Sequence, residues 1–138
     1  MRLLICLLLF SFNQISATHI VGGYISYKHV GGTTYDITFR IYRDCSSQVG
    51  FDGENSSNPN SQLPPFTFSI VADNSPGGSS TAYYTIPFDA SSKKTVSSII
   101  VNPCLTKDNT CVEEATYTRR INLPSATTGY TIVHQRCC

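Results

Sequence analysis

The stretch that decides the fold is Tyr35-Asp36-Ile37-Thr38-Phe39-Arg40-Ile41, in which large apolar side chains occupy every second position. Successive side chains of a β-strand point to opposite faces, so this alternation predicts a strand with one buried and one exposed face. An amphipathic helix would instead repeat its apolar residues three and four positions apart. We therefore expect a half-buried strand over residues 35–41.

Further strand-like segments, rich in β-branched and aromatic residues, lie on both sides of this stretch. They are residues 19–29, interrupted by Gly22-Gly23, and residues 66–72, 82–88, 96–101, 112–123 and 129–135. Turn-forming residues separate them at 31–32, 73–78, 89–92 and 124–129. About seven short strands with this spacing predict an all-β, antiparallel, immunoglobulin-like β-sandwich, with a small barrel or jelly roll as the alternative. No segment is typical of a helix.

The composition bounds the size and the partners of the protein. A chain of 138 residues is long enough for one domain with a buried core. Ten basic residues nearly balance nine acidic ones, which argues against a nucleic-acid-binding surface or a polybasic membrane-binding surface. We expect no nucleic-acid partner.

The N-terminal residues 1–17 have the pattern of a secretory signal peptide. Arg2 supplies a positive charge, residues 3–10 form an apolar run, and Ile15-Ser16-Ala17 offers a small residue for cleavage. The run is too short to span a bilayer. We expect a secreted chain, extracellular or on the cell surface, with a single module over residues 18–138 and no transmembrane segment after cleavage. A non-cleaved anchor is the alternative.

Five cysteines follow the signal segment, and in an oxidising compartment they are expected to form disulfides. Cys104 and Cys111 enclose a short polar loop, and we predict a bridge between them. Cys45 and Cys138 each continue the apolar face of the strand before them. This parity favours a bridge from Cys45 to Cys138, with Cys137 as the alternative partner. The predicted sandwich is therefore stapled by disulfides.

The odd number of cysteines leaves one without a partner in this chain. We expect that partner beyond Cys138, in a longer protein of which this chain is the front end. A free thiol and an intermolecular bridge are the alternatives. A zinc site is disfavoured because the spacing from Cys104 to Cys111 is longer than usual for paired zinc ligands.

Residues 45–65 are crowded with Ser, Gly, Asn and Pro, and their only apolar side chains are Val49, Phe51 and Leu63. We expect a long surface loop, either an ordinary exposed loop or a binding loop. Its acidic stretch, residues 52–55, offers oxygen atoms to calcium but lacks the spacing of a helix-loop-helix calcium site. We therefore expect no cofactor, with calcium as the alternative.

No arrangement of residues points to catalysis. The histidines at 19, 29 and 134 would need a free thiol beside them to activate a nucleophile, and secretion favours disulfides instead. The sequence contains neither a nucleophile elbow nor a glycine-rich phosphate loop. We expect no catalytic residue and no enzyme activity.

Several blocks of the chain together resemble a known family. They are residues 18–23 (THIVGG), 41–45 (IYRDC) and 129–138 (GYTIVHQRCC), with Pro103-Cys104 and Cys111-Val112-Glu113 in the same pattern. These blocks are similar to the N-terminal module of large secreted Bacteroidetes surface proteins. Those proteins carry further immunoglobulin-like or PKD repeats and a C-terminal gliding-motility-associated or type IX secretion sorting domain.

The chain departs from the family at Tyr24, where an acidic residue is usual, and it lacks the Arg-Asn that tends to follow the paired cysteines. The resemblance implies a non-catalytic structural or adhesion module, linked to gliding or matrix attachment. Its partners would be further domains of the same chain and a protein or glycan at the cell surface. The alternative is a carbohydrate-binding accessory module of a secreted glycan-active enzyme, in which residues 45–65 contact the glycan.

Overall fold

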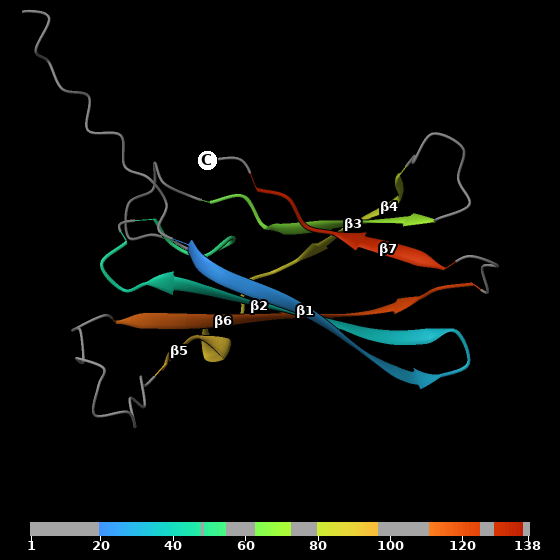
Figure 1. The fold of residues 1–138 in the computed structure, drawn as a ribbon, viewed down its shortest axis with the longest axis horizontal. Coiled ribbons are helices and arrows are strands. Elements are labelled where there is room, and N and C mark those ends of the chain that lie inside the picture. Colours follow the sequence, from blue (N-terminus) through green and yellow to red (C-terminus); the bar gives the residue numbers. More distant parts are fainter. Residues whose placement is uncertain are drawn as a thin grey trace, which may run out of the picture.

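The computed structural model describes residues 20–47, 49–54, 63–72, 80–96, 111–124 and 129–136. These residues form two antiparallel sheets that pack face to face (Figure 1). The predicted all-β sandwich is confirmed.

The strands lie close to the predicted segments. They are β1 (Ile20–Gly31), β2 (Thr34–Asp44), β3 (Phe66–Ala72), β4 (Ser80–Ile86), β5 (Lys94–Val96), β6 (Val112–Asn122) and β7 (Tyr130–Val133). One sheet has the order β1-β2-β6-β5, and the other has the order β4-β3-β7. The strand expected at 96–101 begins earlier, at Lys94, as the short β5. Three predicted segments lie outside the described residues: 97–101, the turn at 73–78, and residues 125–128 of the last turn.

This strand order is that of an immunoglobulin-like domain. In immunoglobulin notation β1, β2, β6 and β5 occupy the positions of strands A, B, E and D, and β4, β3 and β7 those of C′, C and F. Tyr130, at the start of β7, donates a hydrogen bond of 2.7 Å from its hydroxyl to the carbonyl oxygen of Pro124. A tyrosine that bonds back to the chain in this way at the E–F corner is a hallmark of such sandwiches.

The alternation that predicted β2 also directs its core contacts. Ile37 and Phe39 are only 1% exposed, and the Phe39 ring lies 4.9 Å from the rings of Phe66 and Phe68 on the opposite sheet. Tyr117 of β6 stacks on Phe66 at 4.2 Å. The core therefore consists of aromatic rings from the inner faces of both sheets, as period-two burial requires.

The first hairpin follows the predicted turn. Gly32 has a φ of 56°, a left-handed value that glycine adopts without strain. Gly22-Gly23 does not interrupt the strand as predicted, because β1 continues through it with a register shift between Ile20 and Gly22. A Cβ atom on Gly23 would lie 2.7 Å from the carbonyl oxygen of Arg40, so a glycine is needed where β1 approaches β2.

The turn expected at residues 89–92 is a single turn of 3₁₀ helix, η2 (Ala90–Ser92). Asp89 caps it, because its carboxylate accepts a hydrogen bond of 2.9 Å from the amide of Ser91. This turn leads directly into β5, which pairs with β6.

Candidate functional site

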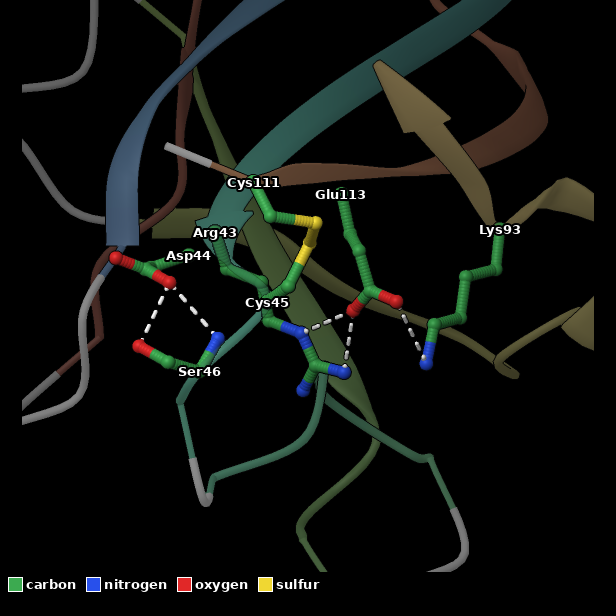
Figure 2. Close-up of a disulfide and its surroundings, with 7 residues drawn as sticks. All are labelled: Arg43, Asp44, Cys45, Ser46, Lys93, Cys111 and Glu113. Carbon is green, nitrogen blue, oxygen red and sulfur yellow. Dashed lines mark hydrogen bonds and ion pairs between the residues drawn. A yellow bond between two sulfur atoms is a disulfide. The ribbon is translucent and has the colours of Figure 1, made fainter. Parts of the chain in front are cut away.

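The disulfide joins Cys45 to Cys111, at the end of the sandwich where β2 stops and β6 begins (Figure 2). The pairing of β2 with β6 is regular along its whole length and ends with Asp44 opposite Val112. The next pair in the same register is Cys45 and Cys111, whose Cα atoms are 5.3 Å apart. The Cys45 amide also donates a 3.0 Å hydrogen bond to the Cys111 carbonyl oxygen. The disulfide therefore joins the residue pair that directly follows the last paired residues of β2 and β6.

The predicted disulfides were wrong in their partners. Cys45 does not bridge to Cys138 or Cys137, and Cys111 does not bridge to Cys104, because Cys45 and Cys111 bridge to each other. Parity along one strand shows which face a cysteine occupies, but not which strand lies beside it. Cys104, Cys137 and Cys138 lie outside the described residues.

The bridge spans 66 positions of the sequence. The chain-entropy model gives about 4 kcal/mol as the upper stabilisation from closing a loop of that length. An interaction of this size would be the largest single contribution to the free energy of unfolding at this end of the sandwich.

Three charged side chains lie beside the disulfide in Figure 2, namely Arg43, Lys93 and Glu113. Glu54 joins them through ion pairs with Arg43 and Lys93. The disulfide and these four charged residues form what we call the clamp: Cys45, Cys111, Arg43, Glu54, Lys93 and Glu113. The Arg43 guanidinium lies 2.7 Å from the Glu113 carboxylate and 3.3 Å from that of Glu54. The Lys93 ammonium lies 2.9 Å from Glu54 and 3.5 Å from Glu113. Two cations and two anions therefore balance in a largely buried site, where an unpaired charge would be costly.

The clamp changes the acidity of Glu54. Burial by itself would raise the pKa of this carboxyl group. Hydrogen bonds from Lys93 and from the Phe51 amide, together with the charge of Arg43, outweigh that effect and hold the pKa below its usual value. Glu54 is therefore ionised at neutral pH and contributes to stability in that form.

Part of the loop predicted to lie on the surface is buried instead. Phe51 is only 2% exposed, and the Arg43 guanidinium lies 4.4 Å from the centre of its ring. The Tyr117 hydroxyl donates a 2.9 Å hydrogen bond to the backbone oxygen of Asp52, and burial raises the pKa of that hydroxyl. The prediction of an exposed loop was therefore wrong for Phe51 and Asp52, which are buried, whereas their neighbours in residues 49–54 are partly exposed. The missed signal was an aromatic side chain in an otherwise polar stretch.

The described residues among the candidate calcium ligands and the histidines have other contacts, whereas Asn55 and His19 lie outside the described residues. The Asp52 carboxylate lies 3.1 Å from the Arg136 guanidinium. His29 donates to the Gly32 carbonyl oxygen at 2.9 Å. His134 donates to the Thr67 carbonyl oxygen at 2.8 Å. In the part of the chain that the structure describes, no three His, Cys, Asp or Glu side chains gather as a metal site would require.

The opposite end of the sandwich, which we call the hairpin end, carries a second candidate site. A hollow of about 280 Å³ lies between the β1–β2 turn and the start of β7, and its lining residues include Thr33, Tyr35, Pro124 and Tyr130. The Tyr35 ring lies 5.0 Å from the His29 ring. The sequence placed Tyr35 and Tyr130 in predicted strands at 35–41 and 129–135 but indicated no binding role for either. Tyrosines beside a glycine turn were the available signal.

The two sites lie about 30 Å apart, since β2 runs the whole distance between them with a rise of about 3.3 Å per residue. Both ends of the described chain lie at the clamp end, because Ile20 pairs with Arg43 and Arg136 contacts Asp52. The hairpin end therefore points away from the positions where the chain enters and leaves the sandwich (Figure 1).

In the described part of the chain, no helix has the length and apolar character needed to cross a membrane. In comparisons with known proteins, no family model matches this chain, and no curated protein or solved structure matches it either.

Proposed function

We propose that this chain is a non-catalytic structural or adhesion module of a secreted cell-surface protein, linked to gliding or matrix attachment. The observation that carries the proposal is the clamp. A disulfide that extends a strand ladder persists in an oxidising compartment and is rare in the cytosol, which agrees with the signal-like pattern of residues 1–17.

The position of the clamp suits a load-bearing module. Force that enters through the chain at either end reaches the sandwich at the clamp, where β2 and β6 are joined covalently. The charged residues of the clamp are balanced, and Phe51 fills the space beneath Arg43. The described residues of the hairpin end lie away from both ends of the described chain, and this position suits contact with a surface or a partner.

Export and oxidation are tested together by expressing the whole chain in a bacterium with an oxidising periplasm. We expect exported protein that begins at Thr18 and yields a Cys45–Cys111 peptide pair in non-reducing mass spectrometry. Cys45→Ser is the matched control for the peptide pair. Retention of the chain in the cytosol with both thiols reduced would argue against a secreted module.

Adhesion is tested by displaying residues 18–138 on a non-adherent host cell and measuring retention under flow. We expect retention on protein-coated or polysaccharide-coated glass, with a several-fold loss in a Tyr35→Ala variant of the hairpin end. Tyr83→Ala is the matched control, because Tyr83 is an exposed tyrosine on the other sheet. Equal retention of displaying and non-displaying cells would contradict the adhesion role.

The second candidate function is carbohydrate binding as an accessory module, and the hollow at the hairpin end favours it. Binding sites for small ligands combine aromatic side chains with a few polar groups, and Tyr35 and Tyr130 lie beside Thr33 in this hollow. Phe51, the aromatic residue of the loop first considered for glycan contact, is buried. A glycan array probed with the wild-type module and with Tyr35→Ala tests this candidate. Defined glycan spots that the variant loses would support carbohydrate binding, and an array without spots would contradict it while leaving adhesion to a protein surface.

A further inference from the structure

The exposed large apolar side chains of this protein gather on β1. Six of the nine in the described part of the chain belong to this strand: Ile20, Val21, Tyr24, Ile25, Tyr27 and Val30. β1 is also the outermost strand of its sheet and has 12 residues, whereas the edge strands β4, β5 and β7 have seven, three and four. Edge strands are usually protected by charges or proline, and β1 has only Lys28. Exposed apolar side chains gathered on a long edge strand are typical of an interaction surface.

The C-terminal half of β1 exposes its inward face. Ile25 lies opposite Phe39 and Tyr27 opposite Ile37, so both side chains point toward the side of the core. They are nevertheless 44% and 73% exposed, because no described strand lies beneath them. Tyr27 thus points out of a sandwich face with no described strand packed under it, and the Tyr35 ring on the same sheet is a neighbour at 6.4 Å.

The N-terminal half of β1 has the opposite shape. A hollow of about 310 Å³ lies on the inward side of Gly23, between Ile25 and Ile41, with His134 and Arg136 as its far wall. β1 cannot fill this hollow from position 23, because a Cβ atom there would lie 2.7 Å from the Arg40 carbonyl oxygen. One strand therefore carries a protruding aromatic ring and a hollow on the same face, on either side of Ile25.

We propose that β1 pairs antiparallel with β1 of a second copy of this chain, centred on Ile25, so that each Tyr27 enters the hollow beside Gly23 of the other copy. Positions 23 and 27 are each two steps from Ile25 and share its face, so this register places them opposite each other. An aromatic side chain across from an edge glycine covers the gap that the glycine leaves. The twofold axis makes the contact twice and closes the assembly as a dimer.

The strand itself suits this register. Register shifts in its pairing with β2 occur only between Ile20 and Gly22 and between His29 and Gly31, so the segment that would pair is regular. Lys28 comes opposite Gly22 of the second copy, so the two lysines do not face each other. A self-complementary edge whose single lysine or arginine is Lys28 fits a second copy better than it fits a strongly charged partner.

Sedimentation velocity on residues 18–138 tests the association, with non-reducing gels to identify any covalently linked species. We expect a reversible non-covalent dimer whose dissociation constant rises about tenfold or more in Tyr27→Ser, as for a central aromatic contact. Tyr83→Ser is the matched control, because Tyr83 is 79% exposed on the other sheet, and it should leave the constant unchanged. A monomer at all concentrations, or equal effects of both variants, would overturn the proposal.

An Ile25→Cys variant tests the register. The two introduced thiols would face each other across the axis, and mild oxidation should link the tryptic peptide that ends at Lys28 to a second copy of itself. The wild-type chain has no cysteine in β1, so this peptide pair is unambiguous in a mass spectrum. A dimer that forms without this cross-link would show that the copies meet elsewhere, and the proposed pairing would then be wrong.

Discussion

β1 and β2 are paired strands of 12 and 11 residues, yet one is exposed along its whole length and the other contributes to the core. Ile25 and Phe39 illustrate the difference, because they lie directly opposite each other and point to the same side of the sheet. Phe39 packs on two rings of the second sheet and is 1% exposed. Ile25 is 44% exposed, although both side chains line the same hollow. The comparison teaches that alternation selects the face of a strand and that the second layer decides whether this face is buried.

The largest expected effect tests this comparison directly. Phe39→Ala should lower the free energy of unfolding by about 3–5 kcal/mol, because it removes a buried ring and leaves a cavity. Ile25→Ala, at the position opposite, should cost about 1 kcal/mol or less, because much of that side chain is already in water. Urea denaturation of dilute protein measures both. Equal losses would mean that β1 is covered in solution.

The next effect on stability concerns the disulfide at the end of β2, which has no counterpart in β1. Cys45→Ser and Cys111→Ser should each lower the free energy of unfolding by about 2–4 kcal/mol, since each removes the same bridge. The double variant should lose no more than either single variant. Thermal unfolding under non-reducing conditions checks this, and additive losses would show that the two cysteines have different partners.

A smaller effect comes from the charges that hold the C-terminal end of β2. The folded-state pKa of Glu54 lies below its ordinary value of 4.5, so this group contributes stability above pH 4.5 and loses it as the pH falls through the folded-state value. Denaturation curves between pH 3 and pH 7 should therefore show stability falling on the acid side. Glu54→Gln should be less stable at neutral pH and should flatten this dependence. An unchanged slope in the variant would assign the acid sensitivity to other carboxyl groups.

The smallest effect concerns β7, the strand at the edge of the second layer. Tyr130→Phe removes only the hydrogen bond to the Pro124 carbonyl oxygen, and we expect a loss of about 1 kcal/mol. Tyr83→Phe is the control, since the Tyr83 side chain is exposed, and its midpoint of thermal unfolding should match the wild type. Equal losses in the two variants would show that the hydrogen bond from Tyr130 to the Pro124 carbonyl oxygen does not stabilise the fold.

Local patterns sufficed for the strands and several turns. The segment predicted at 66–72 coincides with β3, and the alternation at 35–41 lies inside β2. The turn at 31–32 appears as the first hairpin. These features depend on side chains a few positions apart, so the sequence carries them directly.

The candidate sites depended on contacts between distant segments, and there the sequence was insufficient. Cys45 meets Cys111 because β2 and β6 are neighbours, which the parity of either strand does not reveal. Phe51 is buried because Arg43 and Phe88 lie against it.

By itself, then, the sequence predicted an antiparallel all-β fold, with a sandwich favoured over a barrel, and the alternating faces of its clearest strand, because period-two alternation is a local property. Only the tertiary structure decided the disulfide partners, the clamp and the exposure of β1. Those outcomes depend on which strands lie side by side and on where the second sheet stops, and no single strand contains that information.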